Sequence, residues 1–169
     1  QFAKLSQGTL HYVDEGHGPA IVLVHGLAGN LQNFTYGVSK PLAQQYRVIA
    51  VDRPGCGYSK RNANADSSLE AQADTLIELL DHLQIESAVF VGHSLGGAIS
   101  LAAAQRHPGH WDGIARDPRF LGDRRARASQ AVHHIGELLA ERGRRGRLAV
   151  CVCEHGLICK RDRKSTRLN

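Results

Sequence analysis

Several features are scarce in this chain of 169 residues, and each scarcity excludes a class of protein. Cysteine occurs four times, and Cys56 is alone in the first 150 residues, so a disulfide framework is excluded there and a reducing, cytoplasmic compartment is favoured. The longest apolar runs have the length of single strands, which is too short to cross a membrane. Aromatic residues make up 5% of the chain, so the aromatic side chains typical of nucleic-acid surfaces are largely missing.

Methionine is absent altogether, and Gln1 is not a usual first residue. We therefore expect the sequence to be a fragment, so the presence of a signal peptide upstream of Gln1 is undecided.

Charge divides the chain into two parts. Residues 1–105 contain six Lys or Arg and nine Asp or Glu, whereas residues 106–169 contain fifteen and seven.

The basic second part has no regular spacing and no recognisable nucleic-acid motif. An arginine-rich, aperiodic stretch is typical of a shifted reading frame, and residues 163–169 resemble adaptor read-through. We interpret residues 1–108 as the amino-terminal part of one domain and residues 109–169 as an aberrant carboxyl segment. No buried strand is expected between His107 and Gln130, although residues 148–153 form an apolar run that could pair as a strand.

The most informative pattern is Gly-His-Ser-Leu-Gly-Gly at residues 92–97, between the apolar run 87–91 and a helix-forming stretch that begins at Ala98. This context predicts a strand, a sharp turn and a helix, with Ser94 on the turn at positive φ. Gly92 and Gly96 supply the small residues that are needed where strand and helix crowd together. The alternative is a glycine-rich helix start with Ser94 as an ordinary N-cap.

Two other predicted strands also run into glycine-containing turns. Residues 20–24 lead into His25-Gly26-Leu27, and residues 47–51 lead into a turn at residues 52–59 that contains two glycines. We expect all three turns to lie at one end of the sheet, where parallel sheets bind their ligands.

A serine that attacks an acyl group needs backbone N–H groups directed at the oxygen that becomes negative. We expect the amides of Leu27 and Leu95 to supply them, because Leu95 follows the serine and Leu27 lies in a turn across the cleft. His25 is expected to shape that turn rather than to act as a base.

Together, the three strand–turn units resemble the α/β-hydrolase family. The motifs that carry the resemblance are His25-Gly26, the Asp-Arg-Pro-Gly-Cys-Gly-Tyr-Ser turn at 52–59, and residues 92–97; it covers about residues 5–108. The resemblance implies that Ser94 is the nucleophile, that the substrate is a small hydrophobic acyl compound, and that no cofactor is needed. Relatives that dehalogenate alkanes or open epoxides carry an aspartate at this position, so Ser94 argues against both activities.

The expected fold class is α/β, with a mainly parallel sheet and helices on both faces, truncated after the helix that follows Ser94. Residues 9–13 are expected to form a strand and residues 30–46 a helix interrupted near Pro41. Residues 67–70 have the form of a capping box at the start of a further helix. Its apolar face would consist of Leu69, Ala73, Leu76, Leu80 and Leu83.

A catalytic serine also needs a histidine and a carboxylate, which in this family follow the nucleophile in the chain. By chain order alone the possible residues are Asp117, Asp123, Asp162, His133, His134 and His155. None follows a recognisable strand, so acid and base stay unassigned. Two alternatives remain for the function: a non-catalytic relative that binds a small hydrophobic ligand, and an inert fragment.

One group of residues has the chemistry of metal ligands. Cys151, Cys153, His155 and Cys159 lie close together, but their spacing matches none of the common zinc patterns, so no metal site is predicted. The sequence makes no prediction about the oligomeric state.

Overall fold

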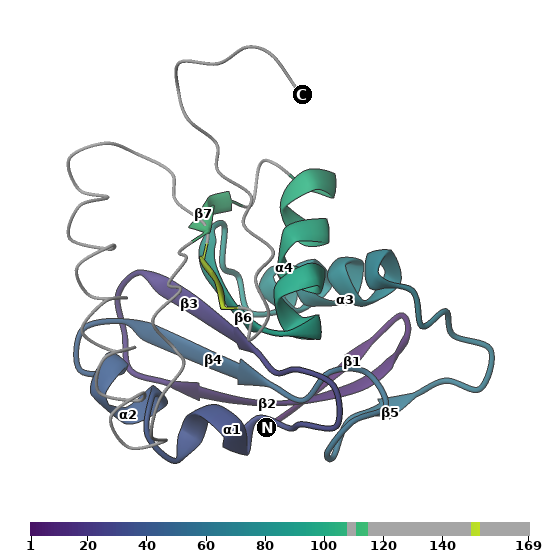
Figure 1. Ribbon diagram of the computed structural model, residues 1–169, viewed down its shortest axis with the longest axis horizontal. Coiled ribbons are helices and arrows are strands. Elements are labelled where there is room, and N and C mark those ends of the chain that lie inside the picture. Colours follow the sequence, from purple (N-terminus) through teal and green to yellow (C-terminus); the bar gives the residue numbers. More distant parts are fainter. Residues whose placement is uncertain (108–110, 115–149, 153–169) are drawn as a thin grey trace, which may run out of the picture.

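The computed structural model in Figure 1 describes residues 1–107, 111–114 and 150–152. The strands are β1 (Phe2–Leu5), β2 (Gly8–Glu15), β3 (Ala20–Val24), β4 (Arg47–Val51), β5 (Lys60–Arg61), β6 (Ala88–His93), β7 (Trp111–Ile114) and β8 (Val150–Val152). The helices are α1 (Gln32–Thr35), α2 (Ser39–Leu42), α3 (Leu69–His82) and α4 (Leu95–Arg106).

The strands form one mixed sheet in the order β1-β2-β4-β3-β6-β7, with β5 paired to β2 and β8 paired to β6. β1 and β2 pair in antiparallel fashion, as do β2 and β4. From β4 onward, each described pairing of β3, β6, β7 and β8 is parallel. The predicted α/β class with a mainly parallel sheet is therefore confirmed.

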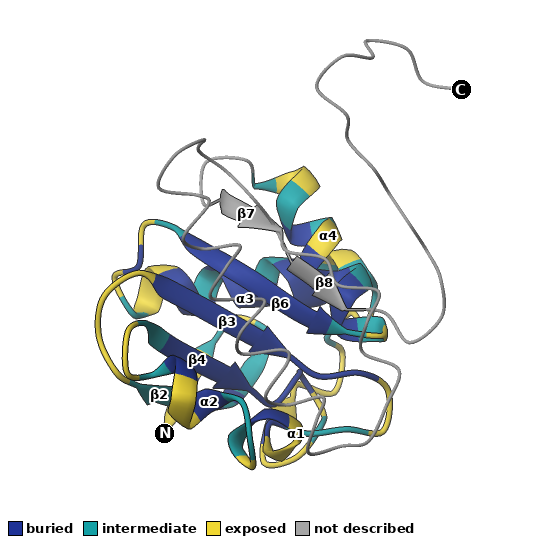
Figure 2. Ribbon diagram, turned by 60° about the vertical axis from the view of Figure 1, so that its left-hand side comes forward, coloured by how far each residue is buried: buried dark blue, intermediate teal, exposed yellow. Residues whose placement is uncertain are grey.

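Both faces of the central strands are covered, which explains their uninterrupted apolar sequences. All five residues of β3 are buried, and Figure 2 shows β3, β4 and β6 buried along most of their length. On one face Val22 and Val24 pack in the cluster that includes α3 and α4, whereas Ile21 and Leu23 pack on the other face with residues of α1 and α2. The helices thus lie on both faces of the sheet, as predicted.

Helix α3 begins one residue later than the predicted capping box implies. Its N-cap is Ser68, whose Oγ accepts a hydrogen bond from the Ala71 N–H at 3.1 Å. Asp66 fixes Ser68 in this role, because it accepts hydrogen bonds from both the N–H and the hydroxyl of Ser68. The predicted apolar face is confirmed: Ala73, Leu76 and Leu80 are buried, and Leu69 and Leu83 pack against the same core.

This cap gives a direct test of where α3 begins. Ser68→Ala should lower the free energy of unfolding by about 1 kcal/mol, because one N–H of the first helical turn loses its acceptor. The neighbouring Ser67→Ala is the matched control and should change it by less than about 0.5 kcal/mol. Urea unfolding of both variants measures the difference, and equal losses would contradict the assignment of Ser68 as N-cap.

The prediction of one helix over residues 30–46, interrupted near Pro41, is wrong. The structure has two single-turn helices, and the interruption falls between them at residues 36–38. Pro41 lies inside α2, where a proline is tolerated because the first turn of a helix has no use for that N–H.

The expectation that no strand follows α4 before Gln130 is also wrong, because β7 pairs with β6 in parallel. Its sequence, Trp-Asp-Gly-Ile, is neither alternating nor continuously apolar, so the pattern did not indicate a strand. The possible pairing of residues 148–153 is confirmed in part: β8 pairs with β6, with Val150 opposite Val91. In the part of the chain that the structure describes, no helix is long and apolar enough to cross a membrane.

Candidate active site

The three glycine-containing turns lie at the same end of the sheet, where β3, β4 and β6 end. Val24, the last residue of β3, is paired with Val51 at the end of β4 and with Gly92 near the end of β6. Because these strands are parallel, the segments that follow them emerge side by side, as the sequence predicts.

Ser94 follows β6 directly and precedes the first residue of α4. Its backbone has φ 51° and ψ −119°, a conformation that costs an L-residue free energy and that occurs most often at functional sites. The residue is exposed, and its side chain makes no capping hydrogen bond to the helix. The alternative interpretation of Ser94 as an ordinary N-cap is therefore not supported.

The glycines around Ser94 permit a close approach of strand and helix. A Cβ atom on Gly92 would overlap the Gly96 carbonyl oxygen, and a Cβ atom on Gly96 would overlap the Val24 carbonyl oxygen. Both positions therefore require glycine, for the steric reason that the sequence predicts.

The turn after β3 lies against Ser94. A Cβ atom built on Gly26 would lie 3.1 Å from the Cβ atom of Ser94, so the two backbones are in near contact. Leu27, the next residue, has 79% of its surface exposed. Among the described residues, the N–H groups of Leu27 and Leu95 donate no hydrogen bond.

His25 is fully buried beneath that turn and uses both ring nitrogens. Its Nε2 accepts a hydrogen bond from the Arg53 N–H at 3.0 Å, so the proton resides on Nδ1, which donates to the Gly26 carbonyl at 2.8 Å. Burial lowers the pKa of His25 below its ordinary value and favours this neutral form. These contacts give His25 a structural role in the turn, as the sequence suggests.

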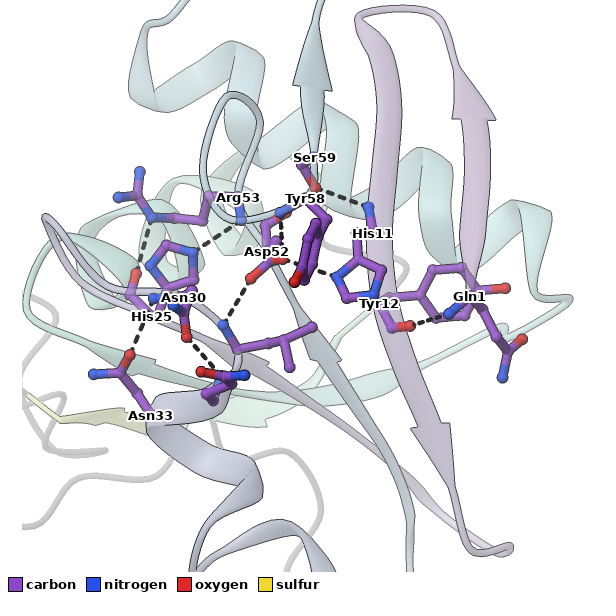
Figure 3. A network of polar contacts seen from close by, with 12 residues as sticks. Gln1, His11, Tyr12, His25, Asn30, Asn33, Asp52, Arg53, Tyr58 and Ser59 are labelled. Carbon is purple, nitrogen blue, oxygen red and sulfur yellow. Dashed lines mark hydrogen bonds and ion pairs between the residues drawn. The ribbon is translucent and has the colours of Figure 1, made fainter.

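Asp52 organises the turn that follows β4 (Figure 3). Its Oδ1 accepts a hydrogen bond from the Leu31 N–H, and its Oδ2 accepts from the Tyr58 N–H and lies 2.8 Å from His11 Nδ1. Burial by itself raises the pKa of Asp52, but these hydrogen bonds outweigh it and hold the pKa below its ordinary value. Gly57 must be glycine, because a Cβ atom there would overlap the Asp52 carboxylate.

The lowered pKa predicts that acid destabilises the fold through Asp52. The ionised carboxylate stabilises the native state above its unfolded-state pKa of 3.8, and this contribution is lost as pH falls towards the lower native-state value. Asp52→Asn should lower the free energy of unfolding at neutral pH by about 1–3 kcal/mol and reduce its dependence on pH in the acid range. Urea unfolding at several pH values measures both effects. Exposed Glu86→Gln is the control, and an unchanged acid dependence in Asp52→Asn would contradict the prediction.

The sequence interpretation missed the polar network formed by His11, Asp52, Arg53, Ser59 and Gln72. The signal for this network in the sequence is the charged pair Asp52-Arg53, which directly follows a buried strand. The contact of His11 with Asp52 depends on the antiparallel pairing of β2 with β4, which the sequence alone does not reveal.

The residues considered for the acid and base roles lie outside the described residues. This holds for Asp117, Asp123, Asp162, His133, His134 and His155. Of the four possible metal ligands, only Cys151 falls in a described element, β8. Within residues 1–107, 111–114 and 150–152, no group of three His, Cys, Asp or Glu side chains is placed to hold a metal ion.

Comparisons with known proteins agree with this architecture. A family model described as the alpha/beta hydrolase fold matches residues 19–115. The 2-hydroxymuconate semialdehyde hydrolase of Pseudomonas sp. (strain CF600) is 40% identical over 97 residues, which are 56% of this chain and 34% of that protein. The dihydrolipoyllysine-residue acetyltransferase component of the acetoin cleaving system of Pseudomonas putida is 44% identical over 91 residues, which are 54% of this chain and 24% of that protein.

Solved structures give a similar result. The naproxen esterase of Bacillus subtilis superposes with a TM-score of 0.63 at 26% identity, covering 67% of this chain and 40% of that one. The epoxide hydrolase CorEH also gives a TM-score of 0.63, at 28% identity, covering 69% of this chain and 39% of that one. The chain thus spans well under half the length of the proteins it matches.

Proposed function

Since the chain belongs to the α/β hydrolase fold family, we propose that it comes from a serine hydrolase that cleaves ester-like acyl bonds, with Ser94 as the nucleophile. The observation that carries the proposal is the backbone of Ser94. A strained, exposed serine between a central strand and a helix is the arrangement that presents a nucleophilic hydroxyl at the end of such a sheet.

In this mechanism the Ser94 hydroxyl attacks the carbonyl carbon of a small hydrophobic acyl substrate. The N–H groups of Leu27 and Leu95 bind the oxygen as it becomes negative, the alcohol departs, and water then releases the acyl group from the serine. No cofactor takes part. The histidine and the carboxylate that would activate Ser94 are not assigned to any residue.

The relatives support a hydrolase and differ in its substrate. Two of them are named for hydrolysis of 2-hydroxymuconate semialdehyde and for an esterase activity, and a third is named an epoxide hydrolase. A serine forms an acyl intermediate with a carbonyl compound, so Ser94 favours the first two kinds of chemistry over epoxide opening.

Covalent labelling tests the proposal on the chain itself. A fluorophosphonate should modify Ser94 faster in the folded chain than in the urea-unfolded chain, because oxyanion donors accelerate the reaction even where the rest of a triad is missing. Mass spectrometry of peptides identifies the labelled residue, and Ser67→Ala is the matched control that should label normally. Equal labelling of several serines, or of none, would contradict the proposal and favour the alternative of a ligand-binding protein.

A further inference from the structure

Arg53 lies two residues beyond the end of β4 and is only 4% exposed. A buried guanidinium usually pairs with a carboxylate, because the loss of hydration is costly. Among the described residues, the hydrogen bonds of this side chain instead go to neutral oxygens: the His25 carbonyl, the Gly26 carbonyl and the Gln72 side chain. The positive charge of Arg53 therefore polarises the peptide units to which the two carbonyl oxygens belong.

The contacts of Arg53 are concentrated on the turn beside Ser94. Its Nε donates to the His25 carbonyl at 2.9 Å and its Nη2 donates to the Gly26 carbonyl at 3.0 Å, so one planar group holds two successive peptide units. Gln72, in α3, accepts from Nη1 at 2.8 Å and anchors the other side of the guanidinium. Figure 3 shows Arg53 beside the His25 ring.

The Gly26 carbonyl and the Leu27 N–H belong to the same peptide unit. Since no described peptide bond is cis, these two groups point in opposite directions. The carbonyl points inward, where it accepts hydrogen bonds from Arg53 and from His25 Nδ1. The Leu27 N–H therefore points away from the buried guanidinium, in the turn that contacts Ser94.

We propose that Arg53 is the positioning residue of the oxyanion site, which fixes and polarises the Gly26–Leu27 peptide so that the Leu27 N–H is a strong, pre-oriented donor. The inference rests on the proposed function of Ser94. A cation at the carbonyl oxygen draws electron density from the amide and strengthens its N–H as a donor, as in cooperative chains of hydrogen bonds. The fixed orientation lets the donor act without reorganisation when negative charge develops.

Two measurements on the full chain test this inference. The first is the NMR chemical shift of the Leu27 amide proton, which should move upfield in Arg53→Lys because the ammonium group cannot hold both carbonyls. The second is the rate constant for phosphonylation of Ser94 by a fluorophosphonate, in which the Oγ–phosphorus bond forms, fluoride leaves and the hydroxyl proton passes to the buffer. That rate constant should fall roughly tenfold, which is less than the cost of about 10²–10³-fold for loss of an entire oxyanion donor.

Arg47 provides the matched control, because it begins the same strand at the opposite end and bonds Asp14 at 2.7 Å. Arg47→Lys should leave both the Leu27 shift and the labelling rate unchanged, whatever its effect on the melting temperature. Gln72→Met removes an acceptor of Arg53 and leaves the residues of the turn unchanged, although it also removes the hydrogen bonds that Gln72 donates to the Ser67 and Ser68 carbonyls. It should shift the Leu27 amide proton in the same direction by less. This variant keeps the inference open to test if Arg53→Lys does not fold.

The outcomes separate this inference from the proposal on which it rests. If Ser94 is labelled in the wild type but Arg53→Lys and Gln72→Met change neither the Leu27 shift nor the rate, the role of Arg53 is overturned and the serine proposal stands. If the shift moves while the rate does not, Arg53 supports the turn without assisting the reaction, and the inference is again overturned. If Ser94 is not labelled at all, both fail together.

Discussion

Ser94→Ala should lower the hydrolysis of short p-nitrophenyl esters by several orders of magnitude, on the order of 10⁴–10⁶-fold, in a protein that joins this sequence to the later strands of the fold. The reason is that the Ser94 hydroxyl forms the covalent bond to the substrate in the proposed mechanism, and alanine has no group that could form it. In the chain of 169 residues itself, we expect weak activity at most, since donors without a base give only residual catalysis.

The measurement is the steady-state release of p-nitrophenolate, with kcat and KM determined separately. The loss should fall on kcat, because removal of one hydroxyl leaves the walls of the substrate site in place. Ser67→Ala is the control, since it removes an exposed hydroxyl just before α3, 27 residues from Ser94 in the sequence. Unchanged turnover in Ser94→Ala would rule out Ser94 as the nucleophile and with it the serine mechanism.

The backbone of the site could be predicted from the sequence because its signals are local. The apolar runs at 20–24 and 47–51 agree with β3 and β4 residue for residue, since a glycine-containing turn follows each of them. The positive φ of Ser94 followed from the two glycines that flank it, which are needed only where strand and helix crowd together.

The features that could not be predicted depend on pairing between distant segments. The bonds of Arg53 to His25 and Gly26 link residues 27 or 28 positions apart, and no local pattern encodes them. At α3, either Ser67 or Ser68 could have capped the helix. Asp66 accepts two hydrogen bonds from Ser68 and so holds the Ser68 hydroxyl in the capping position. Between residues 30 and 46 the apolar residues recur with poor helical periodicity, so the sequence did not indicate that α1 and α2 are only one turn long each.

Gly96→Ala should be strongly destabilising, although it leaves every polar group in place. An added methyl group would overlap the Val24 carbonyl oxygen, which belongs to a central strand and has no flexible end that could move aside. We expect a loss of about 3 kcal/mol in the free energy of unfolding, at the upper end of the range for overpacked interiors, or failure to fold. Helix propensity alone predicts the opposite sign, because alanine in place of glycine favours a helix by about 1 kcal/mol.

The opposite signs make the experiment decisive about how α4 approaches the sheet. Urea unfolding of Gly96→Ala should show the loss, whereas Gln105→Ala, at an exposed position of the same helix, should change the free energy of unfolding by less than about 0.5 kcal/mol. The added methyl group meets backbone atoms, which cannot rotate aside as a side chain can. The overlap can therefore be relieved only if α4 moves away from β3. Such a movement would also carry Ser94 and the Leu95 amide, which share one peptide unit, away from the Gly26–Leu27 turn. A Gly96→Ala chain that folds should therefore label more slowly with a fluorophosphonate. A stabilised and normally labelled Gly96→Ala chain would contradict the close approach of helix and strand on which the proposed site depends.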